Sequence, residues 1–113
     1  MRDAGLPGAA AERRARRHYR LRGYRILGEN VRLGGVEVDL LCRRRGIVVF
    51  CEVKETTGES YGDPLEMVDE RKQSRLRRAA EVWLAEQPVH DQIVRFDVVA
   101  VRGGELERVE NAF

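Results

Sequence analysis

Four charged side chains interrupt two apolar runs between Val36 and Glu55. They are Glu37, Asp39, Glu52 and Lys54. The runs are rich in β-branched and aromatic residues and flank a basic tip that contains a glycine, a pattern that predicts a β-hairpin. Hard carboxylate oxygens beside a lysine are the groups that a magnesium-type site for phosphoryl chemistry uses. This stretch is therefore our candidate for the functional site.

The register of the hairpin decides whether the four side chains meet. With Arg45-Gly46 as a two-residue turn, Asp39 lies opposite Glu52. Glu37 then lies opposite Lys54, and because side chains alternate along a strand, all four project from one face. A four-residue loop keeps this register, whereas a three-residue loop shifts it by one and scatters the group. Three carboxylates on one face repel one another, so we expect a divalent cation between them.

Length and charge set the limits for the rest of the chain. We expect 113 residues to form one domain, 1–113, in which residues 1–7 are a loose terminus. Charged residues make up 35%, but the net charge is only +2, which excludes a uniformly charged polyelectrolyte. Residues 1–25 carry eight arginines and two acids, a balance of +6 against −4 for the remainder. This asymmetry indicates either a basic face for an anionic partner or a solvated helix surface.

The apolar runs and the cysteines indicate a cytoplasmic protein. No run approaches the roughly 18–20 apolar residues of a membrane span, and we find no signal-peptide core near the N-terminus. In the predicted register, Cys42 and Cys51 are diagonal neighbours on the face away from the acids. Diagonal Cβ atoms lie about 7 Å apart, against about 3.8 Å in a disulfide. We expect two buried thiols rather than a bridge.

Lys54 and Lys72 are the only lysines among 21 lysines and arginines. Unless chance placed them there, they are candidates for roles that need a compact ammonium on a flexible stem. Lys72 interrupts the apolar stripe of a helix predicted from the N-cap Asp63 to about Glu86. We expect Lys72 either to snorkel at the edge of the core or to reach the acidic site or a bound phosphate.

A strongly basic helix is predicted from Gly8 to Arg22, ended by Gly23. Its apolar stripe is thin and contains Ala11, Ala15 and Tyr19. Glu12 shares this inward stripe, and an acid on the buried side of a basic helix needs a partner. Two interpretations remain open: a salt bridge to Arg16, or an approach of Glu12 to the acidic face of the hairpin.

The remaining pattern completes the predicted fold. Further strands are expected over 24–33, 92–102 and 105–109, with turns at Gly34-Gly35 and Gly103-Gly104. The start of the strand from Ile47 to Lys54 is apolar on both faces, which is typical of a central strand. The order of helix, three strands, helix and one or two strands predicts an α/β fold with a mixed four- to five-stranded sheet flanked by two main helices.

A set of spaced residues covers nearly the whole chain. It comprises Gly8, Glu12, Ala15, Tyr19, Gly23-Tyr24, Glu37 to Leu41, Phe50 to Lys54, Gly62, Pro64, Lys72, Ala79-Ala80 and Arg95 to Val99. With this set the chain resembles the YraN-like family, uncharacterised bacterial proteins in the restriction-endonuclease-like superfamily that are similar to archaeal Holliday-junction resolvases. The spaced set is far more specific than any single element, because a lone Glu-x-Lys occurs in many unrelated proteins.

The resemblance implies a restriction-endonuclease-like core with assigned site residues. Asp39 and Glu52 would be the two metal carboxylates and Lys54 the catalytic lysine. Glu12 would be a third or a water-mediated ligand. The chain departs from the family where Val36 replaces the usual glycine before the first acid. It departs again at Thr56, where the family usually has an arginine, and this second departure argues against a phosphate clamp at that point.

On this basis we expect a metal-dependent endonuclease, or a nuclease-derived domain, that hydrolyses DNA phosphodiester bonds, with branched DNA as a candidate substrate. Asp39, Glu52 and the Val53 carbonyl would bind Mg²⁺ or Mn²⁺, and Glu37 and Lys72 would support them. Arginines of the first helix would contact the phosphate backbone without reading bases: Arg13, Arg16, Arg17 and Arg20.

Two other functions are compatible with the same residues. One is a non-catalytic nucleic-acid-binding accessory protein that retains the nuclease fold. The other is a protein-interaction module whose acids form ion pairs. A small domain with one basic helix has little surface with which to hold a duplex, and family analogy therefore leads us to expect a symmetric homodimer.

Overall fold

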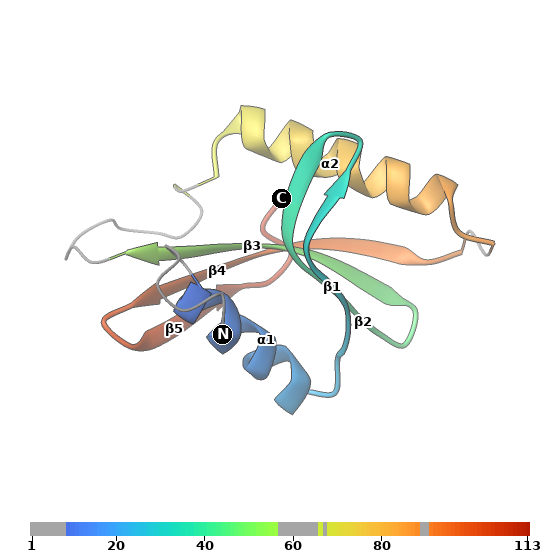
Figure 1. The fold of residues 1–113 in the computed structure, drawn as a ribbon. Coiled ribbons are helices and arrows are strands. Elements are labelled where there is room, and N and C mark those ends of the chain that lie inside the picture. Colours follow the sequence, from blue (N-terminus) through green and yellow to red (C-terminus); the bar gives the residue numbers. More distant parts are fainter. Residues whose placement is uncertain (1–8, 57–65, 67, 89–90) are drawn as a thin grey trace.

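A five-stranded mixed sheet lies between two helices (Figure 1). The computed structural model describes residues 9–56, 66, 68–88 and 91–113. Its elements are α1 (Ala9–Leu21), β1 (Arg25–Leu33), β2 (Val36–Arg44), β3 (Ile47–Thr56), α2 (Glu70–Ala85), β4 (Ile93–Arg102) and β5 (Glu105–Val109). The strand order is β1-β2-β3-β4-β5, and only the β3–β4 pair is parallel. The predicted α/β fold with two flanking helices is confirmed. Within the described residues, no helix is long and apolar enough to cross a membrane.

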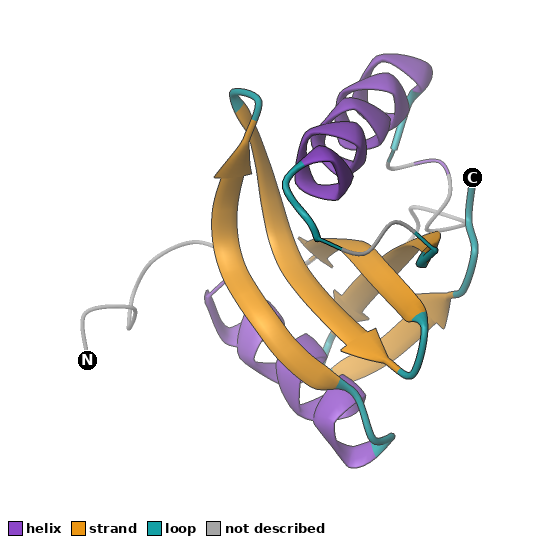
Figure 2. Ribbon diagram, turned by 90° about the vertical axis from the view of Figure 1, so that its right-hand side faces the viewer, coloured by secondary structure: helices purple, strands orange, loops and turns teal. Residues whose placement is uncertain are grey.

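Each helix covers a separate hydrophobic core on its own side of the sheet (Figure 2). Side chains of the α1-side core include Ala11, Ala15, Tyr19, Leu40, Cys42, Val49 and Cys51. Side chains of the α2-side core include Val36, Val38, Val48, Phe50, Leu76 and Ala79. β3 contributes to both cores, which confirms it as the central strand. Both cysteines are free and buried, as expected.

The β2–β3 hairpin has the predicted two-residue turn at Arg45-Gly46. Arg44 pairs with Ile47, and the antiparallel ladder continues to the pair of Leu40 and Cys51. Arg45 adopts a φ of 58°, in the left-handed region that such tight turns use. The register on which the placement of the acids depended is therefore correct for this part of the hairpin.

The sequence predicts two further ladder pairs beyond Leu40: Asp39 with Glu52 and Glu37 with Lys54. Neither pair is part of the ladder, so this prediction is wrong. Beyond Leu40 the described part of β2 pairs with β1 alone, and Glu37 lies opposite Arg32. The side chains of β2 also change faces here, since Leu40 belongs to the α1-side core and Val38 to the α2-side core. The two strands thus separate, and the hairpin of β1 and β2 curves toward α2 (Figure 1).

Helix α2 begins later than predicted. Its N-cap is Asp69, whose side chain accepts a hydrogen bond of 2.9 Å from the Lys72 amide. The expected N-cap Asp63 lies outside the described residues, and Glu66 and Val68 precede the α-helix. An N-cap carboxylate satisfies an amide that the first helical turn leaves unpaired, and Asp69 fills that place directly after the buried Val68.

Candidate active site

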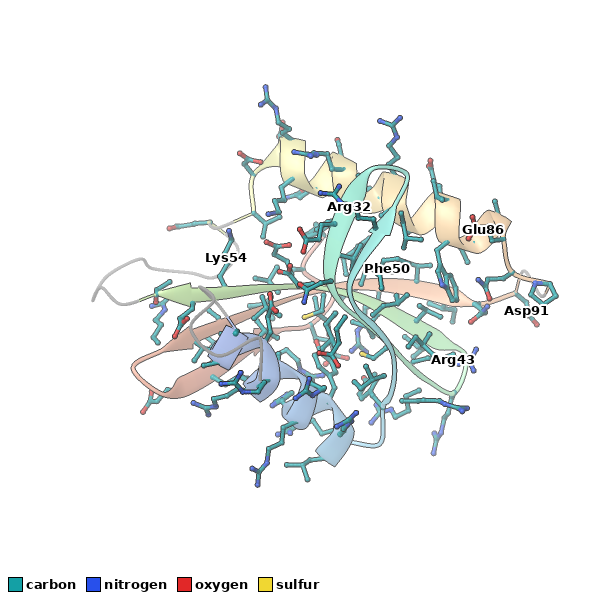
Figure 3. All side chains as sticks on the ribbon, viewed as in Figure 1. Arg32, Arg43, Phe50, Lys54, Glu86 and Asp91 are labelled. Atoms are coloured by element: carbon teal, nitrogen blue, oxygen red, sulfur yellow. The ribbon has the colours of Figure 1, made fainter. Side chains whose placement is uncertain are left out.

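Glu52 carries a buried carboxylate on the α2 side of β3, and only 3% of the residue is exposed. Lys72 Nζ lies 2.8 Å from Glu52 Oε2, and Lys54 Nζ lies 3.8 Å from the same oxygen. Figure 3 shows Lys54 projecting from β3. A buried charge requires such partners to offset its loss of hydration. The only two lysines of the chain therefore meet at one carboxylate, and of the two interpretations of Lys72, the one in which it reaches the acidic site is correct.

Asp39 lies in the gap where β2 and β3 separate. Its Oδ2 accepts a hydrogen bond of 2.8 Å from the Val53 amide, so a side chain takes the position that a ladder partner would otherwise hold. The N–H and C=O of one strand residue point to the same side, and the Val53 carbonyl therefore faces the same gap. The structure thus places the Asp39 carboxylate against the main chain of the residue that follows Glu52, and the charge of Glu52 acts on the pKa of Asp39, by a route other than the predicted pairing.

The electrostatic surroundings of Asp39 favour its protonated form. Burial and the negative charge of Glu52 raise the pKa of Asp39 to about 7, and the charge of Glu12 acts in the same direction. The hydrogen bond from the Val53 amide and the charge of Lys72 act in the opposite direction but are weaker. The lysines of the site therefore do not fully compensate the negative charge of its carboxylates, and only a further positive charge would do so.

This raised pKa predicts that the metal-free protein loses stability as pH rises. Between the ordinary carboxyl pKa of 3.8 and about 7, the folded state keeps a proton that the unfolded chain releases. Asp39→Asn removes this loss and keeps an oxygen for the Val53 amide. We expect its stability advantage over wild type in EDTA to be larger at pH 8 than at pH 5 by about 1–2 kcal/mol, measured by urea denaturation.

The matched control for Asp39→Asn is Glu81→Gln, which makes the same charge change at an exposed position on α2. Its stability relative to wild type should be the same at both pH values. An Asp39→Asn advantage that is equally large at pH 5 and pH 8 would show that Asp39 is ionised across this range and would contradict the raised pKa.

Glu12 approaches the site from α1, on the other side of the sheet. Its Oε1 accepts a hydrogen bond of 3.3 Å from Asn30 Nδ2, while Arg16 pairs with Glu29 at 2.7 Å. Its charge also acts on the pKa of Asp39, as expected if Glu12 points toward the acidic group. Within residues 9–56, 66, 68–88 and 91–113, no three His, Cys, Asp or Glu side chains are grouped closely enough to hold a metal ion together. The predicted role of Glu12 was a third metal ligand, either direct or through a water molecule. The water-mediated role is the one that suits this arrangement.

Asn30 is a site residue that the sequence analysis missed. It has a φ of 52°, in the left-handed region that asparagine tolerates better than most residues, at the place where β2 changes faces. An asparagine within a strand pattern, shortly after the register shift between Ile26 and Gly28, was the signal that could have identified it. Its side chain holds Glu12 at the edge of the site.

The remaining predicted site residues are Glu37 and four arginines of α1. Glu37 is exposed and lines a cavity together with Lys72 and Arg75. The four arginines assigned to nucleic-acid binding line one shallow depression along α1: Arg13, Arg16, Arg17 and Arg20. Three of them are exposed, whereas Arg16 is held by its ion pair with Glu29. A basic face and a solvated helix surface both remain compatible with this arrangement.

The donors at the site fit a hard divalent cation. Two carboxylates and one main-chain carbonyl supply oxygen atoms, which Mg²⁺ and Mn²⁺ prefer over nitrogen or sulfur. The excess negative charge around Asp39 is the observation that favours an added cation. Lys72 supplies the positive charge that such a cation would displace from Glu52.

Fold and site together define an α/β protein with a cluster of carboxylates and lysines where two strands of its sheet separate. The chain belongs to UPF0102, an uncharacterised protein family whose sequence profile matches residues 11–101. This confirms the family resemblance drawn from the sequence motifs. Relatives include UPF0102 proteins of Halorhodospira halophila (42% identical over 111 residues, 98% of this chain and 89% of the relative) and Shewanella amazonensis (40% over 107 residues, 95% and 98%). A third, from Frankia alni, is 44% identical over 101 residues, 89% and 84% of the two chains.

Proposed function

We propose that this protein is a metal-dependent nuclease that hydrolyses phosphodiester bonds of DNA. The observation that carries the proposal is the group formed by Asp39, Glu52 and Val53, which Lys54 and Lys72 border. A largely buried carboxylate with a raised pKa, as Asp39 has, is more common at functional sites than elsewhere, because a purely structural site is more stable with its charges compensated.

Each of these residues has a role that follows from its position. Asp39, Glu52 and the Val53 carbonyl would hold Mg²⁺ or Mn²⁺, an ion that polarises a phosphate oxygen and lowers the pKa of a bound water. The Lys54 side chain is 40% exposed and can reach an incoming phosphate while remaining near Glu52. Its ammonium would offset the negative charge that develops on the phosphate during attack. Lys72 would keep Glu52 oriented while no cation is present.

The nucleic acid would be held through its backbone. Arg13, Arg17 and Arg20 present exposed guanidinium groups along α1, which suit contacts with phosphates rather than with base edges. Such contacts weaken as salt concentration rises, because each one releases counterions from the DNA. A homodimer, which would double this basic surface, stays a prediction from family analogy.

A cleavage assay with matched variants tests the proposal. Wild type, Asp39→Ala and Lys54→Ala are incubated with branched, single-stranded and duplex DNA in Mn²⁺. We expect wild type to cleave at least one substrate and both variants to lose about 10²-fold or more of the rate. Arg78→Ala makes the same charge change as Lys54→Ala at an exposed position on α2 and should cleave like wild type. Equal activity in all four proteins would identify a contaminating nuclease and contradict the proposal.

One observation favours the non-catalytic alternative. The ion pair between Lys72 and Glu52, at 2.8 Å, already supplies a positive charge at the place where a metal ion would otherwise be needed. A nucleic-acid-binding protein that retains the fold without turnover could use this pair permanently. DNA binding that is independent of metal and strongly dependent on salt, without cleavage of any of the three substrates, would support this alternative.

A further inference from the structure

A small cavity lies beside the candidate active site, between the β1–β2 turn and α2. Its volume is about 210 Å³, below the roughly 300–1,000 Å³ of typical small-molecule sites. The charged and polar part of its lining consists of Arg32, Gly35, Glu37, Lys72 and Arg75. Figure 3 shows Arg32 at the hairpin of β1 and β2, beside α2. The size suits one ionic group rather than a complete cofactor.

The lining carries more positive than negative charge among the described residues. Arg32, Lys72 and Arg75 face a single acid, Glu37. Arg32 Nη1 donates a hydrogen bond of 3.1 Å to the Gly35 carbonyl, which folds the side chain over the turn and leaves its other donors for a ligand. Arg75 is exposed and forms no hydrogen bond or ion pair within the part of the chain that the structure describes. Two guanidinium groups with unused donors therefore border the cavity.

The turn that borders the cavity packs directly on the helix. Gly34 has a φ of 60°, and a Cβ at this position would come within 2.9 Å of Val82 Cγ2. Only glycine therefore allows the turn to approach α2 this closely. This contact fixes the position of the turn, which carries Gly35 and Val36 of the lining, relative to α2.

Lys72 connects the cavity to the candidate active site. The residue lines the cavity, and its ammonium lies 2.8 Å from Glu52 Oε2. A group bound in the cavity would thus be the immediate neighbour of a group bound at Asp39 and Glu52. Consecutive phosphates of a nucleic-acid strand are groups of this kind, since they are joined by a single sugar.

We propose that this cavity binds one backbone phosphate of a DNA strand, next to the phosphate at Asp39 and Glu52. The inference rests on the proposed function for the identity of the ligand, but the phosphate site itself does not require cleavage. Arginine suits the role because its planar fork forms paired, charge-assisted hydrogen bonds with phosphate oxygens. The strand would then cross the face of the hairpin on the α2 side, so the α1 arginines alone do not define its path. Glu37 would oppose binding by repulsion.

The first test uses inorganic phosphate as the probe and follows backbone amides by NMR in the full chain. We expect phosphate to shift the amides of Gly35, Val36 and Leu76, and Arg75→Gln to remove most of this response. Arg78→Gln makes the same charge change on α2 outside the cavity and should respond like wild type. Shifts confined to α1, or identical responses of the two variants, would overturn the proposal.

The second test measures the affinity for a labelled oligonucleotide by fluorescence anisotropy in EDTA. We expect Arg75→Gln and Arg32→Gln to weaken binding by about 3- to 10-fold each and Arg78→Gln by less than about 2-fold. Glu37→Gln should tighten binding by about 2- to 5-fold, whereas the exposed control Glu81→Gln should change it less.

The two proposals fail in different ways. If wild type cleaves DNA but Arg75→Gln and Arg78→Gln bind it equally well, the phosphate site is overturned and the nuclease proposal stands. If phosphate shifts the cavity amides and Arg75→Gln weakens oligonucleotide binding, but no substrate is cleaved, the phosphate site stands and the nuclease proposal does not.

Discussion

Glu52→Gln is expected to lower Mn²⁺-dependent DNA cleavage by at least about 10³-fold. Glutamine preserves the shape of the side chain but removes the charge that would hold the cation. It also leaves the ammonium groups of Lys54 and Lys72, which now share Glu52 Oε2, without their common partner. The measurement is the single-turnover rate on a DNA substrate that the wild-type protein cleaves, with circular dichroism to establish that the variant is folded.

The control for Glu52→Gln is Glu70→Gln, which makes the same charge change at an exposed residue in the first turn of α2. Its cleavage rate should stay close to that of wild type. If Glu52→Gln retained a rate within about 10-fold of wild type, the carboxylate would have no part in catalysis, and the proposed cation site would be wrong.

Asp97→Ala is expected to destabilise the fold by about 3–5 kcal/mol. Asp97 is fully buried and accepts hydrogen bonds from Tyr19 Oη at 2.6 Å, from Arg95 Nε and Nη2, both at 2.9 Å, and from the Asn111 amide at 3.0 Å. Alanine would leave the buried Arg95 guanidinium without its ion partner on β4. The network joins α1, β4 and the segment after β5, so we expect the whole sheet to become less stable.

Urea denaturation at pH 7 measures this effect, with Glu110→Ala as the control. Glu110 also pairs with Arg95, at 2.8 Å, but its side chain is 51% exposed, and we expect its removal to cost no more than about 1 kcal/mol. If the two substitutions were equally mild, the buried network would not contribute to stability in the way that its geometry indicates.

Much of the fold could be predicted because it depends on local patterns. Alternation with period two and the glycine-containing turns identified all five strands, and the apolar character of both faces marked β3 as central. The turn at Arg45-Gly46 fixed the register of Leu40 with Cys51, which in turn placed both thiols in the α1-side core. The shared face of Glu52 and Lys54 could be predicted as well, because they lie two residues apart on the same strand.

The rest depends on contacts between segments that are distant in the chain. The position where β2 leaves β3 is set by curvature of the β1–β2 hairpin toward α2, and no local alternation encodes it. The choice of Lys72 between solvent and Glu52 depends on how α2 docks on the sheet. Asp97 and Arg95 read as polar interruptions of an apolar strand, although they form a buried network with α1. The available signal was their spacing: Arg95 and Asp97 lie two residues apart, and therefore on one face of β4, and they alternate with apolar neighbours.

The most direct test of the central claim, that Asp39 and Glu52 share a divalent cation, is a crystal structure of the protein soaked in Mn²⁺. We predict an ion about 2.0–2.3 Å from oxygen atoms of Asp39, Glu52 and Val53, with Lys72 Nζ moved away from Glu52 Oε2. If Mn²⁺ in excess leaves the Lys72–Glu52 ion pair intact and no ion lies between the two carboxylates, the account is contradicted.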